Sequence, residues 1–535
     1  MNRRLFLATI ASLPLLGEGN GFAISNPRFA DNPFTLGVAS GDPDATSVVL
    51  WTKLAMRPLD LDGGMPPADI DVTWEIATSD SFTTILKTGK SRASRLLGHS
   101  VHVEVDGLTP DTWYWYRFQA GDATSPVGRT RTMPIASAQK TAFNFAFASC
   151  QHLEYGYFTA YKHLAADDND IVFHLGDYIY EYAASENRQR RHTNAKLFNV
   201  TDYRIRYNQY RMDPLLQAAH ARCPWFVTWD DHEVENNYAA DISERKGMET
   251  PEFLIHRANA YQVYYEMMPL RRTSIPRGPD MLLYRKAKFG NLAELLVLDT
   301  RQYRADQPNG DGLAPINDAT LSPKQTMLGA TQREWLERGL KGSTGTWNVL
   351  AQQVMMGMVD RSMGPEQKYS MDQWPGYAGE RMALAKFIQE NRIRNTVVLT
   401  GDIHTNWVND LRVDDRKPEL PVVATEFVGT SISSGGDGVD KPRGILLPPK
   451  VANASWTWGN LGYIPTGAAA DFATTNASDC IVNLVYALGA DYRANGAFIM
   501  NSKTAGAVRK MKDADGRFMW GDSLQAGEPA RLMGY

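Results

Sequence analysis

The chain has 535 residues, a formal net charge of −4 at pH 7, 43% hydrophobic residues and 22% charged residues. This length exceeds what one hydrophobic core usually supports, so about two to four domains are expected. The composition is ordinary for a globular protein, and the small acidic excess disfavours a general nucleic-acid-binding scaffold, which carries a basic excess.

The N-terminus has the features of an export signal. Arg3 and Arg4 precede Phe6 and Leu7, and an apolar stretch then continues to Leu16. This pattern resembles a twin-arginine signal peptide, and we predict that residues 1–23 form one. The apolar stretch is too short for a membrane-spanning helix, and we predict no transmembrane segment. The expected location is therefore the periplasm or the extracellular space.

The cysteine content does not indicate a disulfide framework. Cys150, Cys223 and Cys480 are scattered along the chain, whereas small disulfide-rich domains have closely spaced cysteines in even number. Cys223 precedes an apolar run and is interpreted as a small buried hydrophobic residue.

Residues 34–135 are predicted to form a small β domain. The runs 47–52, 71–76 and 113–118 are rich in β-branched and aromatic residues, and turn-forming residues separate them. Their spacing is typical of an immunoglobulin-like or fibronectin-like sandwich. Because no cluster of catalytic residue types occurs in this region, we assign it a packing or spacer role.

From about residue 141 to about residue 440, short apolar runs alternate with longer helix-like segments, which predicts an α/β layered fold. Each apolar run is followed by polar residues. The six runs are 144–149 before Cys150, 171–175 before Asp177, 225–229 before residues 230–233, 295–298 before Asp299, 348–351 before Gln352 and Gln353, and 396–400 before Asp402 and His404. One or two of these residues could be helix caps, but six together favour a ligand site beyond the carboxyl ends of the strands.

The residue types at these strand ends predict a two-metal site. Cys150, Tyr180 and His404 offer sulfur, oxygen and nitrogen donors, which suit trivalent iron or a similar ion, whereas aspartates and asparagines suit calcium or magnesium. Asp177 has two oxygens and could bridge both ions. Two metals close together can clamp a phosphate group, and a metal-bound hydroxide can then attack phosphorus without a serine nucleophile.

Four motifs in the sequence resemble those of a known protein family. They are residues 147–151 (FASCQ), 174–182 (HLGDYIYEY), 229–237 (WDDHEVENN) and 399–404 (LTGDIH). These motifs resemble the PhoD-type alkaline phosphatases and phosphodiesterases of the calcineurin-like and purple-acid-phosphatase superfamily, and the resemblance runs to about residue 440. It implies a β-sandwich followed by a metallophosphatase domain, export by the twin-arginine route, and hydrolysis of phosphomonoesters or phosphodiesters at alkaline pH.

The resemblance also implies the cofactors and the ligand set. The cofactors are Fe(III) and Ca(II), and the expected protein is a monomer that acts on small or polymeric phosphate esters. A phospholipase-like or nucleotide-directed phosphodiesterase would use the same motifs and is the alternative function. The implied ligands are Cys150, Asp177, Tyr180 and His404 for iron, and Asp177, Asp231, Asn237 and Asp402 for calcium.

Three assignments near these motifs have alternatives. Spacing does not separate Asn236 from Asn237 as the calcium ligand. His232 is predicted to contact the substrate or protonate the leaving group, and the alternative is a histidine that only orients Asp231. Arg257 is predicted to bind the phosphate group, and the alternative is a solvated surface arginine.

The C-terminal part of the sequence changes character. Residues from about 444 to 535 resemble an internal piece of the major capsid proteins of tailed phages, through segments such as 454–459, 462–469 and 503–513. We expect this segment to be foreign to the rest of the chain, with a junction in 436–444, and the alternative is a divergent C-terminal domain. An alternative from a different functional class is a phage structural fragment. A capsid subunit would require the full capsid fold and would not require a metal cluster or an export signal.

Overall fold

The computed structural model describes residues 23–362, 366–436, 520–521 and 531–532. The chain divides into two compact units, residues 1–447 and 448–535. In the second unit the described residues form one antiparallel pair, β21 (Trp520–Gly521) with β22 (Arg531–Leu532). Nearly all of the predicted signal peptide, the predicted junction and most of the capsid-like segment, including Cys480, therefore lie outside the described residues.

The first sheet of the larger unit contains strands from the predicted small β domain. Its order is β1-β4-β7-β8, with β5 also paired to β4 and β9 to β7. Its strands are β1 (Ala23–Ile24), β4 (Asp69–Ala77), β5 (Ile85–Ala93), β7 (Trp113–Ala120), β8 (Ala123–Thr124) and β9 (Gly128–Arg131). Apart from the parallel β1–β4 pair, neighbouring strands are antiparallel.

The second sheet crosses the predicted boundary between the two domains. Its order is β10-β11-β12-β2-β3-β6, and its strands are β10 (Phe145–Ala148), β11 (Ile171–Leu175), β12 (Trp225–Thr228), β2 (Val38–Gly41), β3 (Val48–Lys53) and β6 (Ser100–Val105). Strand β12 pairs in parallel with β2 through Trp225 and Gly41. Residues of the first sheet, such as Val72 and Tyr116, share one core with Val38 and Leu50 of this sheet. The predicted division at about residues 135–141 is therefore not a break in the sheet.

The third sheet has the order β13-β14-β16-β18-β20-β19. Its strands are β13 (Arg285–Phe289), β14 (Ala293–Val297), β16 (Trp347–Ala351), β18 (Thr396–Thr400), β20 (Ala424–Val428) and β19 (Trp407–Leu411). The four central strands are parallel, and the two edge strands are antiparallel to their neighbours. All six apolar runs predicted from the sequence overlap strands of the second or third sheet, so the α/β prediction is confirmed.

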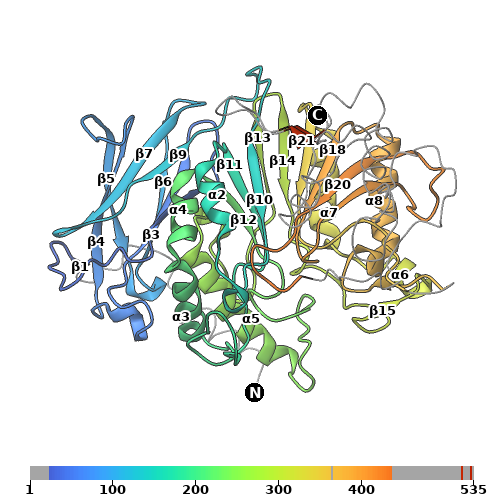
Figure 1. Cartoon of the computed structure of the whole chain (residues 1–535), viewed down its shortest axis with the longest axis horizontal. Coiled ribbons are helices and arrows are strands. Elements are labelled where there is room, and N and C mark those ends of the chain that lie inside the picture. The colour runs from blue at the N-terminus through green and yellow to red at the C-terminus, as the bar shows by residue number, and fades with distance from the viewer. Residues whose placement is uncertain (1–22, 363–365, 437–519, 522–530, 533–535) are drawn as a thin grey trace. The chain divides into compact units, whose positions relative to one another are not determined.

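Helices cover the second and third sheets (Figure 1). The helices are α2 (Ala160–Ala166), α3 (Val200–Arg211), α4 (Pro214–Arg222), α5 (Thr250–Met267), α6 (Asp318–Leu321), α7 (Gly329–Lys341) and α8 (Ala378–Glu390). Helices α2 to α5 share a core with Trp225 of β12, and α7 and α8 share a core with Leu350 of β16. Among the described residues, no helix combines the length and apolar character that a membrane crossing requires.

The inner faces of the second and third sheets form a common apolar core, to which Phe173 and Leu175 contribute from one sheet and Leu295, Val349 and Leu399 from the other. This packing places the carboxyl ends of two sets of parallel strands near each other. The remaining short elements are η1 (Leu61–Gly64), η2 (Arg95–Leu97), η3 (Leu153–Tyr155), η4 (Arg272–Ser274), η5 (Trp374–Tyr377), β15 (Leu313–Ala314) and β17 (Tyr369–Ser370).

The close approach of two strand-end loops depends on Gly176. Its φ is +110°, and a Cβ atom there would lie 2.4 Å from Asp230 Cβ and 2.5 Å from Asp230 N. We predict that Gly176→Ala lowers the free energy of unfolding by at least about 1 kcal/mol, because backbone strain and crowding add together. Gly310→Ala is the matched control, because Gly310 has a φ of +73° but no atom within 4 Å of the new Cβ. Equal losses for the two variants in chemical denaturation would contradict the crowding argument.

Candidate metal centre

The predicted ligands follow parallel strands at one edge of each sheet. Cys150 lies two residues after β10, Asp177 two after β11, Asp231 three after β12, and Asp402 two after β18. Because these strands belong to two sheets that share a core, their ends converge although the residues are distant in sequence.

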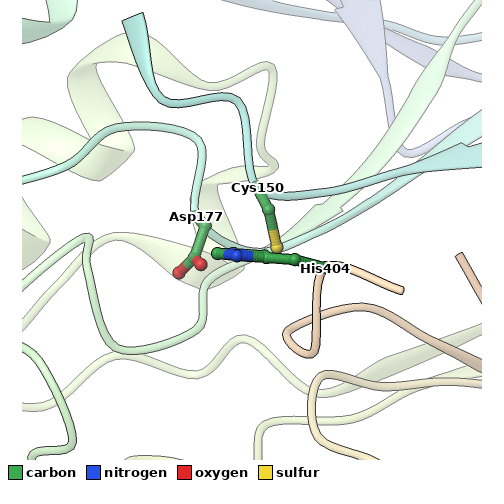
Figure 2. Close-up of side chains that lie close together, drawn as sticks. All are labelled: Cys150, Asp177 and His404. Atoms are coloured by element: carbon green, nitrogen blue, oxygen red, sulfur yellow. The ribbon is translucent and has the colours of Figure 1, made fainter. Parts of the chain in front are cut away.

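A first group of potential ligands contains Cys150, Asp177 and His404. One ligand atom from each lies within 4.8 Å of the others, and Figure 2 shows the three side chains converging from separate segments. The Tyr180 hydroxyl donates a hydrogen bond to Asp177 Oδ2 at 2.9 Å and lies 3.3 Å from His404 Nε2. The structure thus brings together the four residues predicted to bind iron.

A second group contains Asp177, Asp231 and His232, again with ligand atoms within 4.8 Å of one another. Asp177 belongs to both groups, as the bridging prediction requires. Asn237 is near because its backbone N–H donates to Asp231 Oδ2 at 2.8 Å. Asp402 is held by Gln373, which donates to Asp402 Oδ2 at 2.9 Å.

The amides of Asn236 and Asn237 have different surroundings. The Asn236 side chain accepts a hydrogen bond from the Tyr182 hydroxyl at 3.2 Å and donates one to Glu244 at 2.7 Å. Within the described part of the chain, the Asn237 amide has no such partner and remains available to a ligand. This difference favours Asn237.

The backbone at these positions is unusual. Five of the seven predicted ligands have a left-handed backbone conformation, with positive φ values of 58° at Cys150, 56° at Asp177, 52° at Asn237, 63° at Asp402 and 51° at His404. Such conformations are uncommon for residues other than glycine and cost free energy, and they cluster at functional sites.

Burial and like charge raise the pKa values of three predicted iron ligands, Asp177, Cys150 and Tyr180. Asp177 is 2% exposed; burial, and then the nearby carboxylates of Asp231, Asp230 and Glu233, raise its pKa well above the ordinary value despite His232. Burial and the Asp177 carboxylate also raise the pKa values of the Cys150 thiol and the Tyr180 hydroxyl. A bound cation would remove this penalty, because it stabilises the deprotonated forms.

On the side of the second group, Arg301 balances part of the negative charge. Its buried guanidinium lies 2.5 Å from Asp230, 2.8 Å from Asp372 and 3.8 Å from Asp231. Burial opposes ionisation of Asp231, but Arg301 and then His232 outweigh burial and lower its pKa below the ordinary value. Burial and the Asp372 carboxylate raise the pKa of Asp402. Sequence reasoning missed Arg301, although it stands two residues after Asp299 at a strand end.

His232 is oriented by a carboxylate. Its Nδ1 atom lies 2.8 Å from Glu181 Oε2, and Glu181 also accepts the backbone N–H of Asn236. One ring nitrogen of His232 also lies within 4.8 Å of ligand atoms of Asp177 and Asp231. Burial disfavours the imidazolium, but the carboxylates of Asp231, Asp177 and Glu181 together raise the pKa of His232 well above its ordinary value. Glu181 lies inside the 174–182 motif, but its role required the fold.

Other buried polar residues brace the loops instead of facing the ligands. Glu233 accepts the backbone N–H groups of Asp177, Tyr178 and Asp230 at 3.1, 2.5 and 2.9 Å. It therefore fastens the loop after β11 to the loop after β12. Asp299, Gln352 and Gln353, which were counted among the strand-end residues, likewise bond to neighbouring strand ends and loops.

Two residues near the end of the described range 366–436 also contact the site. Ser434 Oγ lies 2.7 Å from the Tyr180 hydroxyl oxygen. His404 Nδ1 lies 2.7 Å from the Gly435 carbonyl oxygen, so this nitrogen carries the proton and Nε2 presents a lone pair. Nothing in the sequence indicated either contact, because the partners are distant along the chain.

The contacts of Arg257 are with residues outside the two ligand groups. It lies on α5, its guanidinium donates to the Ala240 carbonyl oxygen, and it lies 3.5 Å from Asp280. The side chain is buried, so it is not a solvated arginine either. Its substrate-binding role stays a prediction.

The donor set fits bound cations. The first group offers a thiol, a carboxylate, a phenol and an imidazole whose other nitrogen is held by a carbonyl, which is the usual arrangement of a metal-binding histidine. Asp177 Oδ1 is buried and has no hydrogen-bond partner among the described residues. A cation at Asp177 would satisfy this oxygen.

Comparison with known proteins gives three family matches. The model of the PhoD-like phosphatase family matches residues 145–464, and that of the N-terminal domain of PhoD-like phosphatases matches residues 21–134. The phage capsid family matches residues 427–535. Both resemblances stated from the sequence are therefore confirmed. The capsid match begins before residue 444, overlaps the phosphatase match, and includes none of the predicted metal ligands.

Two individual proteins are similar over most of the chain. Alkaline phosphatase D of Bacillus subtilis (strain 168) is 52% identical over 420 residues, which cover 78% of this chain and 72% of that protein. A solved structure of PhoD is 51% identical and superposes with a TM-score of 0.75, covering 78% of this chain and 80% of that one.

The contact between Glu181 and His232 leads to a testable expectation. We predict that Glu181→Gln lowers kcat/KM by about 10- to 100-fold, because it weakens the interaction that orients the imidazole. The loss should be larger for an alkyl phosphate ester than for a p-nitrophenyl ester, because a poorer leaving group depends more on a proton donor. Glu252→Gln, on the exposed side of α5, is the control. An equal loss for both esters would argue against a role through His232.

Proposed function

Because this chain belongs to the PhoD-like phosphatase family, we propose that it is an exported phosphoesterase that uses Fe(III) and Ca(II) at the strand-end cluster. The enzyme is a phosphoesterase of the alkaline phosphatase D type. Our proposal adds the identity of the metals, the role of each residue and the export route.

One observation carries the proposal: Asp177 is common to both groups of potential ligands. We assign iron to Cys150, Asp177, Tyr180 and His404, because this set includes sulfur, phenol and imidazole donors. We assign calcium to Asp177, Asp231, Asn237 and Asp402, because oxygen donors suit a hard cation. When bound, the two cations would supply positive charge that stabilises the oxygens of a phosphate group in the transition state.

The protein side chains would orient the substrate and move a proton. With Nδ1 held by Glu181, His232 can present Nε2 to the leaving-group oxygen. The Glu181 carboxylate on the other ring nitrogen would stabilise the imidazolium, which is the form that a general acid requires. Arg301 would hold Asp231 and Asp230 in place and reduce their mutual repulsion.

The remaining parts of the proposal follow the sequence. Arg3, Arg4 and the apolar stretch to Leu16 support export by the twin-arginine route to the periplasm or beyond. We propose that residues 34–135 act as a packing domain of sandwich type and that the enzyme is a monomer. The substrates would be phosphomonoesters or phosphodiesters, small or polymeric.

Metal content and activity measured on one sample test the proposal. We predict that purified protein contains iron and calcium, hydrolyses p-nitrophenyl phosphate at alkaline pH, and has a visible charge-transfer band from a tyrosinate–iron pair. Tyr180→Phe should abolish the band. Fully active protein without iron would contradict the iron assignment.

The shared ligand gives a second test. We predict that Asp177→Asn lowers kcat by orders of magnitude and reduces the content of both metals, because the ligand set of each ion loses a charged oxygen. Asp168→Asn, a surface carboxylate substitution, is the control. Loss of only one metal would place the bridge elsewhere.

A further inference from the structure

A continuous series of aromatic rings passes along the metal centre. Tyr155 contacts His152 with ring centroids 4.7 Å apart, and His152 contacts Tyr180 at 4.2 Å. Tyr180 contacts His232 at 4.3 Å, and His232 contacts Tyr182 at 5.3 Å. The predicted iron ligand Tyr180 is therefore the middle member of five rings.

The two ends of this series differ from its centre in exposure. The three central rings are nearly completely buried, whereas Tyr155 is 42% exposed and Tyr182 is 37% exposed. The two ends of the series are therefore exposed tyrosines, and we call Tyr155 and Tyr182 the aromatic lips of the site.

Both lips are fixed in orientation. Arg188 lies 4.0 Å above the Tyr155 ring and donates a hydrogen bond to its hydroxyl at 2.9 Å. The Tyr182 hydroxyl donates to Asn236 at 3.2 Å, and Lys196 Nζ lies 5.9 Å from the Tyr182 ring. Rigid rings lose little conformational entropy when they bind a ligand, so these side chains suit recognition.

We infer that Tyr155 and Tyr182 bind flat aromatic groups on the two ester arms of a phosphodiester substrate. This inference rests on the proposed function, because a phosphate held at the metal centre fixes where the two arms can extend. Tyr182 contacts His232, the proposed proton donor, so it lies on the side of the leaving group. His152 and Tyr180 separate Tyr155 from His232 in the series, so we assign Tyr155 to the arm that stays on the phosphate.

Two exposed tyrosine rings favour substrates whose ester arms carry flat rings. A flat ring gains dispersion and quadrupole interactions on a tyrosine that a small alkyl group lacks. Aryl esters and nucleoside esters share this chemistry. A monoester has only one arm and could use only the Tyr182 lip, so Tyr155 should distinguish diesters by their second arm.

Two chromogenic diesters test the arrangement. Bis(p-nitrophenyl) phosphate and methyl p-nitrophenyl phosphate release the same leaving group and differ only in the remaining arm. We expect Tyr155→Ala to lower the ratio of their kcat/KM values by about three- to tenfold. Tyr182→Ala should lower kcat/KM for both diesters by similar factors and leave the ratio unchanged. The corresponding phenylalanine variants keep the rings. Tyr155→Phe should therefore retain most of the wild-type ratio, and Tyr182→Phe should retain most of the wild-type kcat/KM values.

Controls separate a binding role from a structural one. Trp347→Ala removes an exposed aromatic residue at the start of β16, the end of the strand away from the site, and should change neither activity. The metal content of each variant is measured in parallel, because a disturbed centre would lower both activities without changing their ratio. An unchanged ratio in Tyr155→Ala would overturn the inference. A wild-type protein that hydrolyses neither diester nor p-nitrophenyl phosphate would instead overturn the proposed function.

Dithymidine phosphate, which carries a base on each arm, distinguishes the two sources of a flat ring. A loss of its turnover in both alanine variants would identify nucleobases as groups that the lips bind. If Tyr155→Ala lowers the ratio of the two p-nitrophenyl diesters but neither alanine variant loses turnover of dithymidine phosphate, the lips bind aryl groups and not nucleobases.

Discussion

The site depends on one electrostatic constraint, the concentration of negative charge where the carboxyl ends of parallel strands from two sheets converge. Four of the carboxylates involved, Asp177, Asp230, Asp231 and Asp372, are at most 7% exposed, and Asp402 is half-buried. Buried carboxylates are unfavourable unless they are paired, protonated or bound to a metal. Arg301 pairs with Asp230 and Asp372 and lies near Asp231. Among the described residues, no lysine or arginine forms an ion pair with Asp177, and burial with the neighbouring carboxylates raises its pKa despite His232, so a bound cation would stabilise its ionised form.

The protein maintains this arrangement through backbone strain and buried braces. Left-handed conformations at most of the predicted ligands turn their side chains toward a common centre, and such strain persists only where the surroundings enforce it. Glu233 does so for the loops after β11 and β12 by accepting three backbone N–H groups. Glu426 has the same function in the third sheet, where it accepts from the backbone of Met356 and Gly357. The carboxylates of both glutamates hold backbone N–H groups in place, so neither residue is a candidate metal ligand.

The sequence predicted the parts of this account that depend on local pattern. Apolar runs such as 171–175 identified strands, and the residues after them identified candidate ligands, because strand ends are local features. Contacts between distant segments could not be predicted. The pairing of β12 with β2, which joins the predicted small β domain to the catalytic sheet, depends on tertiary packing. The contacts of Arg301 with Asp372 and of Ser434 with Tyr180 likewise join residues far apart in the chain. Residue type alone also did not distinguish the bracing Glu233 from the neighbouring candidate ligand Asp231.

The central claim is that Asp177 joins two different cations. Anomalous diffraction from crystals of the metal-loaded protein, recorded on both sides of the iron absorption edge, would test this claim most directly. Our account predicts an iron peak bounded by Cys150, Tyr180 and His404, a second peak of a lighter ion beside Asp231 and Asn237, and Asp177 oxygens in contact with both. A single peak, or two peaks of which only one contacts Asp177, would contradict it.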